Sequence, residues 1–490
     1  MLFTSLSFFV FLPLTLALFA VLPAGQRWAW LLLASYIFYA AWDPSNLFHL
    51  AAVTIIIYGC GWGMDRTTGK FARIGLLTAG LLAVLGSLIA FKFYDFIAGE
   101  IERLGVAMLG AEAAFAVPRL GEKSPVGFSF YAFSGVSYLV DVYVRRLSGG
   151  QSPGHTALYV AYFPKIFAGP IERAPTFLPQ LRDGLRADPV LLVLGLQLIG
   201  WGLFKKAVIA DNLAPLVDRN FSIPAFAPPI ELLLSVYFFA FQIYCDFSGY
   251  TDIAIGVSLL FGVRLMENFR RPYLSRNTAE FWGHRWHISL GRWFRDYLYI
   301  PLGGGRTGPV RRYVNIMAVF VVSGLWHAGL GYGVGWTFLI WGALNGLYQW
   351  IGLATAPFWR RLGEHLPRLG ASVPLLVARV VLTFHLIAVA WVFFRAASVS
   401  DALLILQRIG TNLGQIPGLL TRYPFSTEHY LGAALIALLM FIEILDERFS
   451  IWERLAAAPL VLRWGVYYAG IFALMILGRW QVSEFIYMQF

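Results

Sequence analysis

The sequence predicts an all-α protein that crosses a membrane many times, and three observations lead to that prediction. Only 13% of its 490 residues are charged, whereas soluble domains carry about 25%. Hydrophobic residues make up 58% of the chain, and the mean hydropathy is +0.66. Apolar stretches near the length that a spanning helix needs, about 20 residues, recur along the whole chain. A soluble enzyme, a disordered chain and a fibrous chain are therefore excluded as classes.

The candidate spanning stretches follow one another from the first residues to the end of the chain. They are residues 3–22, 28–42, 47–63, 74–97, 125–143, 156–171, 190–213, 232–262, 313–328, 334–352, 374–395, 430–446 and 463–478. Some of them are short, so we expect about 10–12 true spans together with re-entrant or tilted segments. The first stretch lacks a basic segment and a small-residue cleavage site, which favours a retained helix. No loop is long enough for a soluble domain, and we expect one membrane-embedded domain over residues 1–490.

The charge balance of the chain is basic, with 38 Lys and Arg against 27 Asp and Glu and a net charge of +11. In a membrane protein this excess marks cytoplasmic loops, and no basic run suggests a nucleic-acid partner. We expect the N-terminus and the loop 98–124 outside, and the basic loops 64–73 and 145–150 in the cytoplasm. Two cysteines inside apolar stretches exclude a disulfide framework and a cysteine-based zinc site.

The stretch 264–312, expected on the cytoplasmic face, has the densest positive charge. All of its basic residues are arginines: Arg264, Arg270, Arg271, Arg276, Arg285, Arg292, Arg295, Arg306, Arg311 and Arg312. Arginine is preferred where phosphate or carboxylate is bound by two parallel hydrogen bonds. Aromatic residues are interspersed, so we expect amphipathic or re-entrant helices here. Two interpretations stay open, which are positive-inside topology with an aromatic belt, or a surface that receives a phosphate-bearing ligand.

His327 is the clearest candidate for a catalytic residue, within a region 313–352 that we expect to hold the chemistry. No charged residue occurs from Val314 to Tyr348, and ionisable side chains at membrane depth are usually functional. Glycines on both sides of His327 indicate a broken helix that lines a cavity. A neutral histidine there suits general-base catalysis. The alternative is a histidine that only hydrogen-bonds between packed helices.

Other polar residues support weaker hypotheses. On a regular helix Glu280, His284 and His287 would share one face, a spacing that also suits a metal ion. We expect no metal, because no second ligand cluster is evident and Arg285 adds positive charge beside them. His284 is expected at the membrane interface.

Asp246 and Asp252 are expected to pair with arginines of the following loop, or one of them to orient a catalytic group. The glycines at 303–305 favour a tight loop over a phosphate-binding nest. His385 is expected to be a packed hydrogen-bonding residue.

Three segments are distinctive: YCDFSGYTDIAIGVSLLFG, ENFRRPYLSRNTAEFWGHRWHISLGRWFRDYLYIPLGGGR and SGLWHAGLGYGVGWTFLIWGALNG. They resemble the membrane-bound O-acyltransferase (MBOAT) family, most closely its alginate O-acetyltransferase branch. The segments YFPKIFAGPIERAPTFLPQL and LFKKAVIADNLA and the ending SEFIYMQF extend the resemblance over nearly the whole chain. It implies a ring of tilted helices with a central tunnel, and transfer of an acyl group from a thioester to a hydroxyl.

The resemblance also implies roles for particular residues. The family's near-invariant histidine corresponds to His327, as general base, and its second position, His or Asn, to His287. Relatives often carry a further histidine where this chain has Asn345. Residues expected to bind substrate or donate hydrogen bonds to it are Trp286, Arg285, Arg292, Arg295, Trp326 and Asp246.

The function that follows from the resemblance is O-acetylation of an exported polysaccharide such as alginate, from the bacterial inner membrane. The expected donor is a cytoplasmic thioester, acetyl-CoA or a phosphopantetheine carrier, with no bound cofactor. Expected partners are membrane lipids and periplasmic acetyltransferase proteins. One alternative is transfer of D-alanyl or another acyl group to a cell-wall polymer or lipid. Another is a transporter of acyl groups or lipids without catalysis, because buried His and Asp also serve proton relays.

Overall fold

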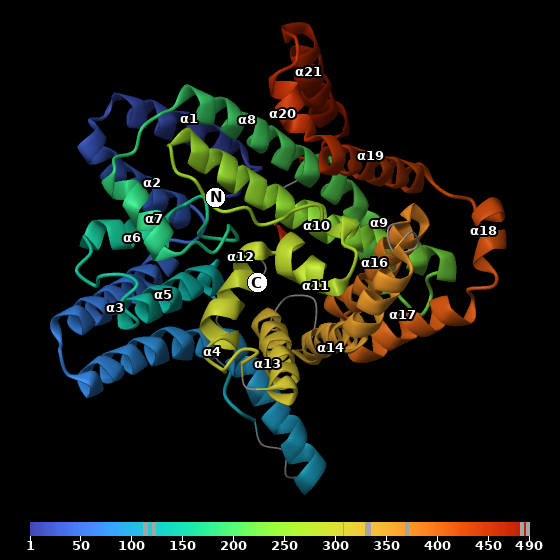
Figure 1. The fold of residues 1–490 in the computed structure, drawn as a ribbon, viewed down its shortest axis with the longest axis horizontal. Helices are drawn as coiled ribbons and strands as arrows, with labels where there is room; N and C mark the ends of the chain where they lie inside the picture. Colours follow the sequence, from blue (N-terminus) through green and yellow to red (C-terminus); the bar gives the residue numbers. More distant parts are fainter. Residues whose placement is uncertain are drawn as a thin grey trace. The chain divides into compact units, whose positions relative to one another are not determined.

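A computed structural model describes residues 1–110, 116–119, 124–306, 308–328, 335–367, 372–480 and 485–486. Within these ranges every regular element is a helix (Figure 1), which confirms the all-α class. The chain divides into two compact units, each described by itself. The first unit contains residues 1–199 and 253–266, and the second contains residues 200–252 and 267–486. The predicted single domain over residues 1–490 stays a prediction.

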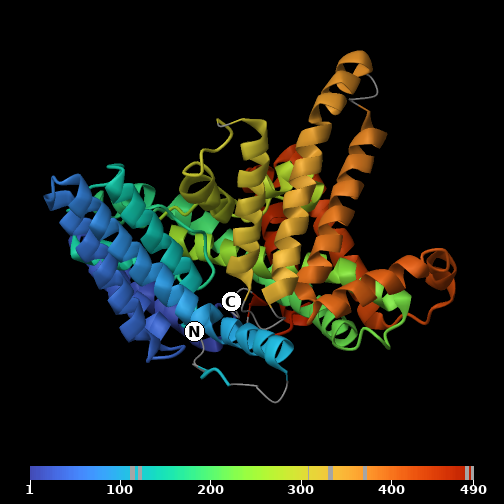
Figure 2. The same ribbon diagram turned by 90° about the horizontal axis from the view of Figure 1, so that it is seen from below.

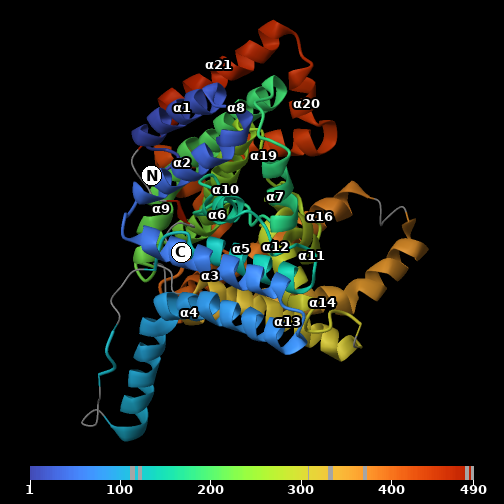
Figure 3. The same ribbon diagram turned by 90° about the vertical axis from the view of Figure 1, so that its left-hand side faces the viewer.

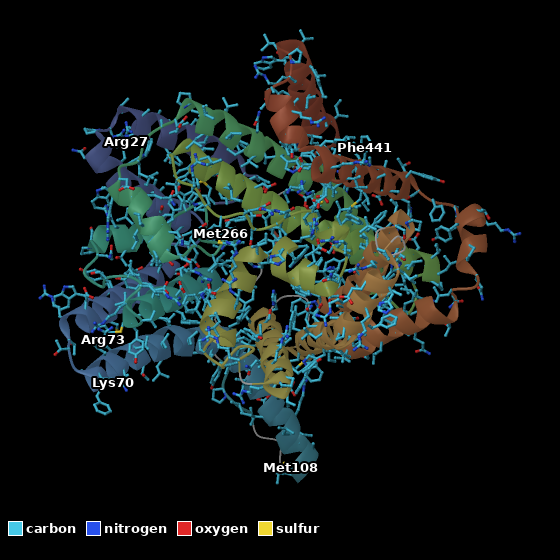
Figure 4. The ribbon with its side chains drawn as sticks, in the orientation of Figure 1. Arg27, Lys70, Arg73, Met108, Met266 and Phe441 are labelled. Atoms are coloured by element: carbon cyan, nitrogen blue, oxygen red, sulfur yellow. The ribbon has the colours of Figure 1, made fainter. Side chains whose placement is uncertain are left out.

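The first unit is built on three helices that pack side by side, α3, α4 and α5 (Figure 3). Its elements are α1 (Leu6–Val21), η1 (Ala24–Gln26), α2 (Arg27–Ala40), α3 (Asn46–Arg66), α4 (Lys70–Leu109), α5 (Phe128–Tyr143), α6 (Pro153–Ala161), α7 (Ala174–Arg182) and most of α8 (Pro189–Leu203). In Figure 4, Lys70 and Arg73 lie at the beginning of α4 and Met108 near its other end. With 40 residues, α4 is about 60 Å long, twice the apolar thickness of a bilayer.

The two basic loops of the first unit lie at the same end of it. Arg73 donates a hydrogen bond to the carbonyl oxygen of Tyr143, at the end of α5, over 2.8 Å. The carboxylate of Asp65 accepts one from the hydroxyl of Ser148 over 2.8 Å. The sequence assigns both loops to one side of the membrane, and these contacts agree with that assignment. Which side they occupy stays a prediction.

The second unit contains the helices that surround both predicted catalytic histidines. Its elements are η3 (Phe204–Ala210), α9 (Asp211–Ser222), most of α10 (Pro229–Leu260), η4 (Pro272–Leu274), α11 (Thr278–Glu280), η5 (Phe281–Arg285), α12 (Ile288–Phe294), η6 (Arg295–Tyr299), α13 (Pro309–His327), α14 (Gly335–His365), α16 (Val373–Arg395), α17 (Val399–Thr411), α18 (Ile416–Arg422), α19 (Thr427–Phe449), α20 (Ile451–Ala456) and α21 (Leu460–Leu477). The neighbours α13, α14 and α16 run side by side, coloured yellow to orange in Figure 2.

Seven of the described helices are long and apolar enough to cross a membrane, which makes this a multi-pass membrane protein. They are Asn46–Arg66, Lys70–Leu109, Pro189–Ser222, Pro229–Leu260, Val373–Arg395, Thr427–Phe449 and Leu460–Leu477. The apolar helix Leu6–Val21 is shorter. The prediction of 10–12 spans also counts the stretches 125–143 and 156–171, where the structure has α5 with 16 residues and α6 with 9.

A close crossing of α13 and α14 fixes the end of α13. A methyl group added at Gly342 would overlap the carbonyl oxygen of Phe320, and one added at Gly324 would overlap that of Phe338. The two glycines therefore let the backbones touch, as small residues do between membrane helices. Gly324 lies one turn before His327, the last residue of α13. The crossing thus determines where the predicted catalytic histidine lies.

We expect Gly342→Ala to lower the melting temperature, because the new methyl group meets backbone and forces the two helices apart. Overpacking of this kind costs about 1–3 kcal/mol. Gly352, on the same helix, faces open space, so Gly352→Ala is the matched control and keeps or slightly raises stability. Thermal unfolding in detergent measures both variants. Equal melting temperatures for the two would contradict the close crossing.

Candidate active site

The two histidines singled out in the sequence line one cavity in the second unit. Its volume is about 280 Å³, and its lining comes from the segment 279–299 and from α13 and α14. Lining residues used below are His287, His327, Trp282, Trp286, Trp341, Arg295, Arg312 and Gln349. The fold therefore brings together side chains that are far apart in the sequence, with arginines and histidines in the same cavity.

His287 is positioned by an unusual backbone conformation. The helical segment before it ends at Arg285, and His287 itself has φ of +42° and ψ of +53°, in the left-handed region. This region is uncommon for residues other than glycine and costs of order 1–3 kcal/mol. The side chain of His287 is only 2% exposed. The strained turn thus places a polar ring inside the protein, at the start of α12.

The same turn removes the helical face that a metal site would need. The helical segment ends before it reaches His287. No regular helix therefore carries Glu280, His284 and His287 on one face, and His284 is exposed. Within the part of the chain that the structure describes, no three His, Cys, Asp or Glu side chains are grouped so that they would hold a metal ion.

A hydrogen bond to Asn268 fixes the tautomer of His287. The Oδ1 atom of Asn268 accepts the backbone N–H of Ser289 over 3.2 Å. A backbone N–H only donates, so this atom is an oxygen and not a flipped amide nitrogen. Nδ1 of His287 lies 3.1 Å from the same oxygen and must therefore carry the proton. Nε2 is then the basic nitrogen of His287.

The tautomer of His327 follows in the same way. Its Nδ1 lies 2.7 Å from the carbonyl oxygen of Ser323, which only accepts hydrogen bonds. Nδ1 therefore carries the proton and Nε2 has the lone pair. The ring of His327 is 2% exposed, and its centre lies 4.6 Å from that of Trp326 and 5.0 Å from that of Trp341. The basic nitrogen of His327 is therefore surrounded by apolar, aromatic side chains.

Asn345 holds one wall of the cavity. Its Oδ1 accepts the indole N–H of Trp282 over 3.0 Å, and its Nδ2 donates to the carbonyl oxygen of Trp341 over 2.8 Å. Asn345 is fully buried. The amide of Asn345 thus fixes the orientation of a tryptophan.

Of the six residues predicted to contact substrate, only Trp286 and Arg295 line the cavity. Arg285 points elsewhere, with ion pairs of 2.9 Å to Glu280 and 2.8 Å to Glu447. Arg292 is exposed outside the lining, and Trp326 packs against His327 without lining the cavity. Arg295 lines the cavity and also lies 2.9 Å from the carboxylate of Asp296, and sequence alone does not predict which arginines face a cavity.

Asp246 also lies outside the cavity lining, and its partner differs from the expected one. Its carboxylate lies 2.7 Å from the ammonium group of Lys206, and Asp252 lies 2.6 Å from that of Lys205. Both aspartates thus pair with lysines, not with arginines of the following loop. The π-helix η3 carries the two lysines and buries them.

Two further predictions can be compared with the structure. His385 hydrogen-bonds through both ring nitrogens, to the hydroxyl of Tyr237 over 3.0 Å and to the carbonyl oxygen of Val381 over 2.8 Å. His385 thus forms hydrogen bonds as predicted, but it is exposed, so the packed position that the sequence suggested is wrong. The glycines at 303–305 form a tight turn, in which the N–H of Gly304 donates to the carbonyl oxygen of Tyr299 over 2.9 Å.

Comparison with known proteins identifies the family. Residues 35–366, which contain both cavity histidines, match the model of MBOAT, the membrane-bound O-acyltransferase family. The chain belongs to this family. The resemblance noted from the motifs is thereby confirmed, and the protein is an O-acyltransferase.

Several relatives have names that specify the acyl group. "Probable alginate O-acetylase AlgI" of Azotobacter vinelandii is 37% identical over 398 residues, which are 80% of this chain and 74% of the relative. "Peptidoglycan O-acetyltransferase" of Helicobacter pylori is 33% identical over 443 residues, which are 84% and 80% of the two chains. "Teichoic acid D-alanyltransferase" of Bacillus subtilis is 28% identical over 281 residues, 55% of this chain and 68% of the relative.

We expect the stability of the protein to fall in mild acid because of His287, which lies outside the seven candidate spans. Burial, and then the neighbouring His327, lower the pKa of His287 well below 6.5. In the unfolded chain a histidine titrates near 6.5. Below that pH the unfolded state binds the proton and the folded state does not, so stability present above pH 6.5 is lost.

The measurement is the melting temperature at pH 7 and pH 5 for the wild type and for His287→Asn, which cannot titrate. Between pH 7 and pH 5 the melting temperature of the wild type should fall more than that of the variant. Identical losses would show that His287 does not contribute to the acid sensitivity.

Proposed function

We propose that this enzyme transfers an acetyl group from a cytoplasmic thioester to hydroxyl groups of an exported polysaccharide. The observation that carries the proposal is one cavity lined by two buried histidines and by Arg295 and Arg312. Two relatives that match at least 80% of the chain are named for O-acetyl transfer, with alginate and peptidoglycan in their names. The acceptor is thus proposed as a polysaccharide, and alginate is one candidate.

In this proposal His327 is the general base. Its Nε2 takes the proton of the acceptor hydroxyl while the hydroxyl oxygen attacks the thioester carbonyl carbon, which forms a C–O bond and an oxyanion. When the oxyanion collapses, the C–S bond breaks and the sulfur leaves as a thiolate. The imidazolium of His327 returns the proton to that thiolate. The products are an ester and a thiol, and no proton is gained or lost.

The tautomer of His287 limits what this residue does. Its only N–H is directed at Asn268, so neutral His287 has no proton to donate to the oxyanion. Its Nε2 is an acceptor and suits a hydrogen bond from the incoming hydroxyl. His287 is therefore proposed to orient the acceptor.

Arg295 and Arg312 provide the positive charge of the cavity. Both guanidinium groups belong to exposed residues that also line the cavity. Phosphate groups occur in both proposed donors, acetyl-CoA and a phosphopantetheine carrier, and arginine binds them with charge-assisted hydrogen bonds. The predicted cytoplasmic position of 264–312 places these arginines on the side where such donors occur. Inner-membrane localisation and periplasmic partner proteins remain part of the proposal.

Two alternative functions make different predictions. D-alanyl transfer is supported by the Bacillus subtilis relative, which matches only 55% of this chain. Transport without catalysis would use buried charges as a proton relay. Lys205, Lys206 and Asp246 are buried and Asp252 is half-buried, and they form close ion pairs. Labelled acetyl and D-alanyl donors, supplied in parallel to the purified protein, distinguish the three functions.

We expect His327→Ala to reduce acetyl transfer by about 10²–10⁴-fold, because the acceptor hydroxyl loses its base. The measurement is transfer from labelled acetyl-CoA to polysaccharide by protein purified in detergent. The matched control is His385→Ala, which removes a histidine of α16 that lies outside the cavity lining. Wild-type transfer by His327→Ala, with normal expression and membrane insertion, would refute the proposal.

We expect Arg312→Gln to raise the KM for acetyl-CoA about tenfold with little change in kcat, since a charged hydrogen bond contributes about 1.5–3 kcal/mol. Arg311, its neighbour on α13, is exposed but does not line the cavity. Arg311→Gln therefore keeps the KM of the wild type. Steady-state kinetics over a range of acetyl-CoA concentrations separates the two parameters. Parallel changes in both variants would indicate a general effect of charge instead of a binding site.

A further inference from the structure

We infer that the indole N–H of Trp341 is the hydrogen-bond donor that stabilises the oxyanion of the transfer reaction. This inference rests on the proposed acyl transfer and assigns a role that neither histidine has, which is donation of a hydrogen bond to the oxyanion. In the transition state the carbonyl oxygen becomes negative, and a donor at that oxygen is among the largest contributions an enzyme makes. The donor has to lie beside His327, because the attacked carbon lies next to the hydroxyl that His327 deprotonates.

Three other donors near His327 are engaged. The N–H of His327 is directed at Ser323 and that of His287 at Asn268. The indole N–H of Trp282 is bound by Asn345. The carboxamide of Gln349 also lines the cavity, but eight residues along α14 separate it from Trp341, which is about 12 Å along the helix axis. Gln349 therefore serves a different part of the cavity.

Trp341 has the properties of a preorganised donor. It is 1% exposed and lines the cavity, and its ring centre lies 5.0 Å from that of His327. In the part of the chain that the structure describes, its Nε1 is buried and has no hydrogen-bond partner. A buried donor left unsatisfied costs about 1–3 kcal/mol. That cost is offset when a substrate oxygen accepts the N–H, and most fully when the oxygen is negative.

The neighbours of Trp341 hold its ring in one orientation. Trp391 stacks on it with ring centres 5.9 Å apart and planes 18° apart. Trp282 and Phe394 meet it edge to face at 5.5 Å and 5.3 Å. A donor that is already fixed does not need to reorganise when charge develops. Trp341 takes no part in the covalent steps, and its N–H remains intact throughout the reaction.

Trp391 provides a matched control for this role. Its Nε1 is likewise buried without a hydrogen-bond partner among the described residues, and its side chain is 0% exposed. Unlike Trp341, it does not line the cavity. Replacing either tryptophan by phenylalanine removes one indole N–H and part of one ring from the same stacked pair. If the role of Trp341 were purely structural, the two variants would therefore have similar activities.

The experiment measures kcat and KM for labelled acetyl-CoA with Trp341→Phe, Trp391→Phe and the wild type. We expect kcat to fall about 10²–10³-fold in Trp341→Phe, as when one oxyanion donor is removed. The KM for acetyl-CoA and the affinity for free CoA, which has no acyl carbonyl, should remain close to those of the wild type. Trp391→Phe should keep most of its activity.

Three results would overturn the inference. Equal losses of kcat in the two variants would indicate packing alone, and a loss confined to KM would indicate ground-state binding. A loss in Trp286→Phe without one in Trp341→Phe would assign the donor to Trp286, another indole of the lining. If the wild type transfers no acetyl group at all, the proposed function fails instead, so the two failures are distinguishable.

Discussion

The backbone contact between α13 and α14 at Gly324 and Gly342 determines the geometry of the candidate site. It places His327 at the end of one helix, against Trp341 on the other. A side chain at either glycine would separate the two helices and with them the base and the proposed oxyanion donor. Glycine is needed here for the close approach of two backbones and not for an unusual torsion angle. The chemistry of the site thus depends on two residues that take no part in it.

The same hydrogen-bond arrangement leaves Nε2 as the basic nitrogen in both histidines. Each directs Nδ1–H at an oxygen that only accepts, the carbonyl of Ser323 for His327 and the amide of Asn268 for His287. The anchor lies on the same helix in the first case and 19 residues earlier in the second. The backbone strengthens the second contact, because the N–H of Ile288 donates to the carbonyl oxygen of Asn268 over 2.9 Å. His287 and Asn268 are therefore held as one unit in spite of the strained torsion at His287.

The sequence was sufficient to predict the fold class, because low charge is a property of composition. It singled out His327 as a lone histidine in an apolar stretch, the resemblance added His287, and the structure places both in the lining of one cavity. The resemblance of the motifs identified the family that the comparison confirmed. The partners of charged residues were not predictable, since Arg285 and Asp246 are bound by Glu447 and Lys206, which are distant in the chain. Asn268 and Trp341 were missed for a related reason. Asn268 matters because it binds His287, and Trp341 matters because its N–H has no hydrogen-bond partner among the described residues. A pattern of residue types reveals neither property.

The amide of Asn345 has a consequence for how the site responds to acidity. An asparagine holds the indole of Trp282 at any pH, whereas a histidine in its place would change its hydrogen bonding when it gains a proton. Among the cavity residues that the structure describes, imidazoles occur only at 287 and 327. Among these lining residues, the side chains that titrate near neutral pH are therefore the two imidazoles. Relatives with a third imidazole at this position would have a more complex titration, with a wall of the cavity that itself changes with pH.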